Sequence, residues 1–225
     1  MVSWPERPDA RGQVEDEAYR ILRSRLDLTR LPRLSRDVTE RIICASADLS
    51  YVGDLVCAED SLAAAVVALA AGAPVIADGP MVAAGIAGWP VICKADEPLT
   101  TRLARTAGIG AAAAAVRLAF GEAGSGAVWV VGCEPSAIYE IIGRGVQPAF
   151  VIGVPAGLAG AAEAKKALRG SGLPALTNIS CKGGPVTAVA ACLALLRRAS
   201  SVPAKRPRRG GGDPATAVLQ EDMTL

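Results

Sequence analysis

The sequence predicts an α/β fold with a mostly parallel sheet of about five strands, doubly wound in a Rossmann-like manner. Between Ala127 and Leu168, two short apolar runs, AVWVV and FVIG, are each followed by glycine, proline and then a helical pattern. A run of about five consecutive apolar residues is typical of a strand covered on both faces. Regular alternation of strand, turn and helix indicates parallel strands, whose carboxyl ends share one edge of the sheet, where ligands bind.

The remaining elements follow from apolar spacing and from residues that start or end helices. The further helices are predicted at residues 14–26, 34–46, 58–71, 100–121 and 186–198. Ser35 is expected to cap the second of these helices, and Gly72 to end the third. The strands are predicted at residues 74–77, 90–93, 127–131, 150–153 and 174–179. Residues 49–56 are expected to be a helix end or a loop.

Composition divides the chain into three parts. Residues 1–13 are polar and carry two prolines, which predicts a flexible N-terminal arm. Residues 14–199 are expected to form one domain, because about 186 residues can bury a sizeable core. Residues 200–225 contain the stretch KRPRRGGGDP and little apolar surface, which predicts a disordered tail.

Charge and residue usage exclude several function classes. The net charge of +2 gives no basic face for nucleic acid, and no apolar run is long enough for a membrane span. With no basic start followed by an apolar stretch, the chain is expected to be soluble and cytoplasmic. Its six cysteines form no C-x-x-C pair, so neither a metal site nor a disulfide framework is expected. The chain has no histidine, which excludes histidine acid–base chemistry and histidine metal ligation.

Four loops combine glycine and proline directly after a predicted strand. They begin at Asp78, Gly132, Gly153 and Ser180. Glycine lets a ligand approach the backbone, and a helix start offers free N–H groups, although the same residues also make ordinary turns. None of the loops matches G-x-G-x-x-G or a Walker sequence, so a nucleotide-binding enzyme is only weakly supported.

These loops resemble one known family, the precorrin-8X methylmutases of cobalamin biosynthesis. Residues 78–86 resemble that family's D-x-x-M-V-x-x-G-I loop, and residues 132–137 its G-N-A-P-T-A. Residues 153–159 resemble its G-x-P-V-G-F-V, and residues 163–165 its E-S-K. Residues 180–185 stand where the family has G-R-x-G-G-S. The order and spacing hold through most of the chain, so residues 14–199 are identified as a member of this family.

The resemblance implies a fold, a reaction and a set of site residues. The fold is a three-layer α/β/α enzyme, usually a homodimer with its site near the subunit interface. The reaction moves a methyl group from C11 to C12 of a corrin-type tetrapyrrole, without any cofactor or metal. A histidine is thought to protonate the ring, while loop backbones and arginines hold it. The implied substrate-binding residues are Asp78, Met81, Val82, Gly85, Glu134, Pro135, Gly153, Pro155, Gly157, Lys182, Gly183 and Gly184.

Several side chains that carry the family's chemistry differ in this sequence. Cys44 stands at the histidine position, either as a replacement proton donor or as a small buried residue. The family's Thr-Arg pair falls on Gly110 and Ala111. The arginine of G-R-x-G-G-S falls on Cys181, although the neighbouring Lys182 offers a cation.

Two hypotheses follow from these differences. The first is a methylmutase-type isomerase in which Cys44 or a solvent proton replaces the histidine. The second is a catalytically impaired relative that binds a corrinoid or a pathway partner. The missing histidine and arginine favour the second hypothesis on mechanism, while the retained loops favour the first.

Overall fold

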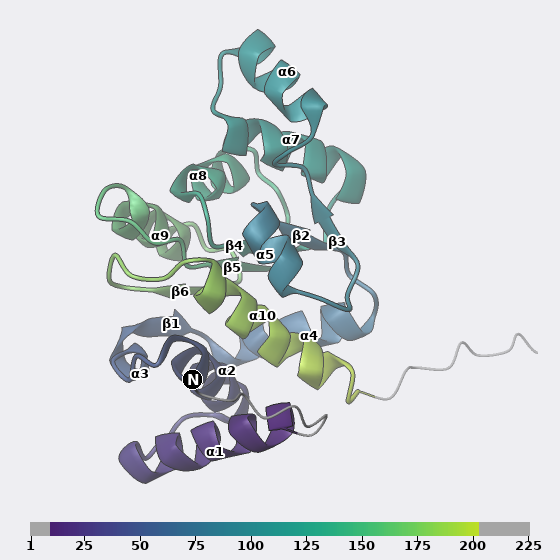
Figure 1. Ribbon diagram of the computed structural model, residues 1–225. Helices are drawn as coiled ribbons and strands as arrows, with labels where there is room; N and C mark the ends of the chain where they lie inside the picture. Colours follow the sequence, from purple (N-terminus) through teal and green to yellow (C-terminus); the bar gives the residue numbers. More distant parts are fainter. Residues whose placement is uncertain (1–9, 203–225) are drawn as a thin grey trace, which may run out of the picture.

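The computed structural model describes residues 10–202, which form a six-stranded sheet with helices on both faces (Figure 1). The helices are α1 Ala10–Arg25, α2 Arg33–Ser46, α3 Tyr51–Asp54, α4 Glu59–Ala70, α5 Pro80–Gly85, α6 Pro98–Ala107, α7 Ala111–Ala123, α8 Pro135–Gly143, α9 Ala161–Gly170 and α10 Pro185–Ala199. The strands are β1 Leu55–Cys57, β2 Val75–Ala77, β3 Val91–Cys93, β4 Val128–Val131, β5 Phe150–Gly153 and β6 Ala175–Asn178. The α/β class predicted from the sequence is confirmed.

The sheet has the strand order β1-β6-β5-β4-β2-β3. All neighbouring strands are parallel except β1, which runs antiparallel to β6 at the edge of the sheet. The five strands predicted from sequence are the five parallel ones. The chain passes from β2 outward to β3 and then returns to β4 on the other side of β2. The strand order therefore reverses between β2 and β4.

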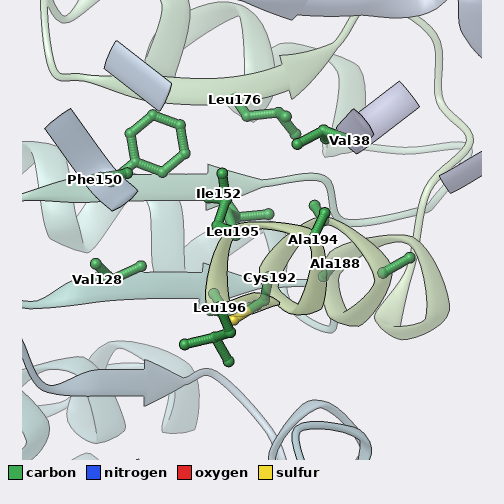
Figure 2. Packing of buried hydrophobic residues seen from close by; sticks show 14 of the residues in the cluster. Val38, Val128, Phe150, Ile152, Leu176, Ala188, Cys192, Ala194, Leu195 and Leu196 are labelled. Atoms are coloured by element: carbon green, nitrogen blue, oxygen red, sulfur yellow. The ribbon is translucent and has the colours of Figure 1, made fainter. Parts of the chain in front are cut away.

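Two helical layers cover the sheet (Figure 1). Helices α2, α4, α5 and α10 bury one face, and α7, α8 and α9 bury the other. Every residue of β4 and β5 is buried, as a strand covered on both faces requires. Figure 2 shows the first face, where Val128, Phe150 and Ile152 of the strands lie beside Cys192 and Leu195 of α10. The expected three-layer arrangement is confirmed.

The predicted cap of α2 is wrong. The helix begins at Arg33, after Pro32, and Ser35 lies within its first turn. Its first amides are instead bound by the carboxylate of Glu59 from α4, which accepts from Leu34 N at 2.7 Å and from Ser35 N at 2.9 Å. Ser35 Oγ donates to the same carboxylate at 2.6 Å. A side chain 24 residues away thus replaces the local cap, because it reaches the same N–H groups and carries a negative charge.

The single helix predicted over residues 100–121 is two helices. Gly108 adopts a left-handed conformation with φ of 63° and ends α6, and α7 begins at Ala111 after a bend of 115°. Within residues 10–202, no single helix is long and apolar enough to cross a membrane, and α6 and α7 pass that test only as this bent pair.

The edge strand and the chain ends also differ from the predictions. Leu55 and Val56, expected to belong to a helix end or loop, lie with Cys57 in strand β1, because this segment's backbone pairs with β6. Helix α1 begins at Ala10, so the predicted arm over residues 1–13 is helical in its last four positions. Residues 1–9 and the tail from residue 203 onward lie outside the described residues.

Candidate functional site

The loops that follow β2, β4, β5 and β6 lie along one edge of the sheet, which we call the rim. In a parallel sheet, ligands bind at the carboxyl ends of the strands and especially where the strand order reverses. Here that reversal lies between the loop at Asp78, after β2, and the loop at Gly132, after β4. The predicted site residues of these loops therefore lie at the edge where a sheet of this order binds ligands.

Asp78 links the two loops at this reversal. Its carboxylate accepts hydrogen bonds from the backbone N–H groups of Gly132 at 3.1 Å, Cys133 at 2.7 Å and Glu134 at 2.9 Å. Burial raises the pKa of Asp78, and these N–H groups oppose that shift. Gly79 is required beside it, because a Cβ there would lie 2.7 Å from Cys133 Sγ. Asp78 thus fixes loop geometry, and its oxygens face the backbone.

The loops after β5 and β6 are linked by backbone hydrogen bonds. Gly184 N donates to the carbonyl of Val154 at 2.7 Å, and Gly157 N donates to the carbonyl of Cys181 at 3.0 Å. Gly183 has a φ of +145°, and a Cβ there would lie 2.2 Å from Val154 O. Only glycine fits so close a contact, which explains why the G-G pair is needed at this turn.

A buried polar network under the β6 loop was missed by the sequence analysis. Lys165 of α9 is fully buried, and its ammonium donates to Asn178 Oδ1 at 2.9 Å, Ser180 O at 2.6 Å and Lys182 O at 2.8 Å. Burial lowers the pKa of Lys165 to about 8. Asn178 in turn donates to Asp54 of α3 at 2.9 Å. The E-S-K resemblance marked the lysine, but nothing local indicated its partners.

The ammonium of Lys182, proposed from sequence as a substitute cation, is engaged within the protein. It donates to Asp48 Oδ2 at 2.7 Å and to the hydroxyl of Ser50, and it lies 4.2 Å from the centre of the Tyr51 ring. The hydrogen bond that Asp48 accepts from Lys182 makes the largest contribution to lowering the pKa of Asp48, to about 2. Any anionic ligand would compete with Asp48 for this cation.

The other predicted residues divide by exposure. Met81 and Glu134 are exposed at the rim, whereas Val82 and Pro155 are buried. Two glycines are packing positions. A Cβ at Gly85 would lie 2.6 Å from Val189, and one at Gly153 would lie 2.4 Å from Leu168. Pro135 begins α8.

Cys44 lies on the side of α2 that faces α1. Burial raises the pKa of its thiol, and the carboxylates of Glu40 and Glu15 raise it further. Tyr19 of α1 lies close enough to interact electrostatically with the thiol. The thiol is therefore the protonated S–H form at neutral pH. Asp48, four residues after Cys44, reaches Lys182, so the end of α2 approaches the rim.

A cavity of about 720 Å³ opens between α1, α2 and α10, and the sequence analysis did not predict it. Its lining includes Tyr19 and four acidic residues. It also includes five arginines, which are Arg20, Arg23, Arg41, Arg197 and Arg198. Arg23 pairs with Glu40 at 2.7 Å, and Arg41 pairs with Glu15 at 2.8 Å. The two pairs flank the face of α2 that carries Cys44. Guanidinium groups in this arrangement can bind carboxylates if they exchange their partners.

No set of side chains suited to binding a metal ion is found in the part of the chain that the structure describes. Over residues 10–202, no group of three or more histidine, cysteine, aspartate or glutamate side chains could hold a metal ion. The six cysteines are all free thiols, and Cys181 is exposed on the β6 loop.

Comparisons with known proteins agree on one family. The sequence model of precorrin-8X methylmutase matches residues 13–198. A precorrin-8X methylmutase from Sinorhizobium sp is 33% identical over 196 residues, covering 82% of this chain and 93% of that protein. A cobalt-precorrin-8 methylmutase from Methanothermobacter thermautotrophicus is 35% identical, covering 82% and 95%. The crystal structure of precorrin-8X methyl mutase from Thermus thermophilus is 29% identical, with a TM-score of 0.77, covering 84% and 97%.

Proposed function

This chain belongs to the precorrin-8X methylmutase family, whose members are isomerases of cobalamin biosynthesis, and we propose that it moves a methyl group from C11 to C12 of a precorrin-8-type corrin precursor. The observation that carries the proposal is the intact rim, where Asp78 joins the loops after β2 and β4. The loops after β5 and β6 are likewise joined through Val154 and Gly157. Because the migration is intramolecular, holding and polarising the ring supplies much of what the reaction requires.

We propose that the Cys44 thiol donates the proton that starts the migration and that the resulting thiolate takes a proton back from the product, since an isomerisation consumes no net proton. Cys44 stands at the position of the family histidine, and its raised pKa keeps it in the S–H form at neutral pH. A thiol is a weaker acid than imidazolium, so protonation is expected to be slower than in a histidine-bearing relative. Cys44 is thus a catalytic residue in this proposal, and no cofactor or metal takes part.

The cavity between α1, α2 and α10 suits the carboxylate side chains of a corrin precursor, and its lining includes Glu40, one helical turn before Cys44. The guanidinium groups of Arg23 and Arg41 lie at its wall, each held by an internal carboxylate. An incoming substrate carboxylate would replace Glu40 or Glu15, so the arginines exchange one charged partner for another. This arrangement compensates for the missing arginines at Ala111 and Cys181, where the family has them and this chain has uncharged side chains.

A second candidate function is corrinoid binding without turnover. It is favoured by the absence of histidine from the whole chain and by the engagement of Lys182 with Asp48. The retained rim would then serve as a binding surface for a corrinoid or a pathway partner.

We further propose that the protein works in the cytoplasm as a homodimer, as the family resemblance implies. Large apolar side chains are exposed on the rim loops and at the start of α10: Met81, Leu158, Ile179 and Val186. Exposed apolar side chains gathered on one edge are typical of a surface that a second subunit covers. Sedimentation equilibrium measures the subunit number directly, and a monomer at micromolar concentration would contradict this part of the proposal.

A spectral assay tests the proposed reaction. Purified protein is mixed with precorrin-8, and the visible spectrum is followed for conversion to hydrogenobyrinic acid. A histidine-bearing family member provides the positive control. Conversion above the no-enzyme rate supports the isomerase. No conversion, with folded protein and an active control, contradicts it and favours the binding function.

A further inference from the structure

We propose that Lys165 is a positioning residue that holds the loop from Ile179 to Gly184 in the shape needed to bind the substrate. This inference rests on the proposed function. It adds a residue that never touches the substrate and acts from beneath the rim.

The ammonium of Lys165 donates to two carbonyl groups of the loop and to one side chain at the end of β6. It has three N–H groups and contacts three acceptors, two of which are the backbone carbonyls of Ser180 and Lys182. The third acceptor is Asn178 Oδ1 at the end of β6. With the pKa of Lys165 near 8, the ammonium form predominates at pH 7. Both carbonyl groups are therefore held inward by one buried positive charge.

Asp54 binds the opposite side of the same loop. Its carboxylate accepts from Ser180 N at 2.8 Å, from Ser180 Oγ at 2.7 Å and from Ile179 N at 3.1 Å. Asn178 bridges the two charges, since its Oδ1 accepts from Lys165 and its Nδ2 donates to Asp54. The amide of Ser180 thus faces a negative charge and its carbonyl faces a positive charge. Such paired contacts define one loop conformation.

This conformation determines what the rim presents to a ligand. The carbonyls of Ser180 and Lys182, on either side of Cys181, point inward. Cys181 itself is exposed, at the position of a family arginine. The carbonyl of Cys181 accepts from Gly157 N, and Gly184 N donates to Val154 O. A shift of the β6 loop would therefore also displace the glycine loop after β5, which links Lys165 to two of the rim motifs.

Replacing Lys165 with methionine tests this role. Methionine fills a similar volume but removes the ammonium, which leaves the carbonyls of Lys182 and Ser180 only the amide Nδ2 of Asn178, at 2.8 Å and 3.4 Å. Lys166→Met is the matched control, because Lys166 is the next residue of α9 and is exposed. Lys165→Gln retains two N–H donors and is expected to be intermediate. It also carries the comparison if Lys165→Met does not fold.

The first measurement is amide hydrogen exchange without substrate. In Lys165→Met, residues 179–184 and 154–158 are expected to exchange at least tenfold faster, with strands β4 and β5 unchanged. Lys166→Met should behave as the wild type. This measurement does not depend on turnover, so it tests the positioning role even if the proposed reaction fails. Unchanged exchange in the two loops would overturn the inference.

The second measurement separates KM from kcat with precorrin-8. The loop binds the substrate, whereas the proposed proton donor lies on α2, so Lys165→Met should raise KM about tenfold and change kcat less than about threefold. A loss of folded protein alone would lower the apparent kcat and leave KM unchanged, and that result would overturn the positioning role. If the wild type does not turn over, the Kd for hydrogenobyrinic acid replaces KM, with the same tenfold change expected.

Discussion

Replacing Cys44 with histidine tests the proposed proton donor most directly. The variant restores the residue type that the family resemblance implies, at a position where α2 faces α1. Glu40 and Glu15 lie near enough to raise the pKa of the Cys44 thiol. The same carboxylates would favour a charged imidazolium, whereas burial and the guanidinium groups of Arg23 and Arg41 would oppose it, so we work the magnitude from the ordinary histidine pKa of about 6.5.

The size of the effect follows from acid strength. Unperturbed cysteine and histidine differ by about two pKa units, and a Brønsted slope near one half makes each imidazolium about tenfold faster as a donor. Roughly a quarter of an unperturbed imidazole is protonated at pH 7, and about three quarters at pH 6. Cys44→His should therefore raise kcat about twofold at pH 7 and about eightfold at pH 6. The raised pKa of the thiol makes it a weaker donor and would enlarge both figures.

The assay is single-turnover conversion of precorrin-8 between pH 5.5 and 8.5. Cys44→Ala should lower the rate at least about tenfold, because general acid catalysis contributes that much or more. Cys93→Ala is the control, since Cys93 is also a half-buried free thiol but lies on β3. An unchanged rate in Cys44→Ala would remove Cys44 from the mechanism. A gain in Cys44→His that does not grow as the pH falls would refute the proton-donor reasoning.

Three further predictions concern the framework of the site. Gly153→Ala should lower the free energy of unfolding by about 1–3 kcal/mol, because its Cβ would lie 2.4 Å from Leu168; a neutral result in urea unfolding would contradict the packing argument. Glu59→Gln should lower the free energy of unfolding by about 1–2 kcal/mol, because glutamine loses the negative charge and one of the two oxygens that accept from the first amides of α2. The native pKa of Glu59 is lowered, so this difference should shrink as the pH falls below the ordinary range of a glutamate and the carboxylate protonates. Asp48→Asn should cost less than about 1 kcal/mol at pH 7, because the carboxylate paired with Lys182 is 37% exposed. That difference should vanish as the pH falls from about 4 to about 2, and a constant difference would contradict the pKa of about 2.

Local patterns in the sequence determined the parallel sheet. The runs that form β4 and β5 are apolar at every position, and that pattern has few alternatives to a strand buried on both faces. Gly183 fixed the loop after β6, since few other residues adopt a positive φ. Pro135 fixed the start of α8, since proline begins a helix readily. The absence of histidine, which limits the chemistry, is likewise a property of the sequence alone.

The tertiary structure decided what depends on contacts between distant residues. Strand β1 has three residues, too few for a pattern, and it exists because β6 pairs with it. Ser180 and Asp54 are separated by 126 positions, so no local signal could show that they bind each other. The buried ammonium of Lys165 and the engagement of Lys182 with Asp48 have the same origin. Local propensity and spacing specify elements, whereas charge pairing is specified only when folding brings the partners together, and in this protein the geometry of the site depends on that pairing.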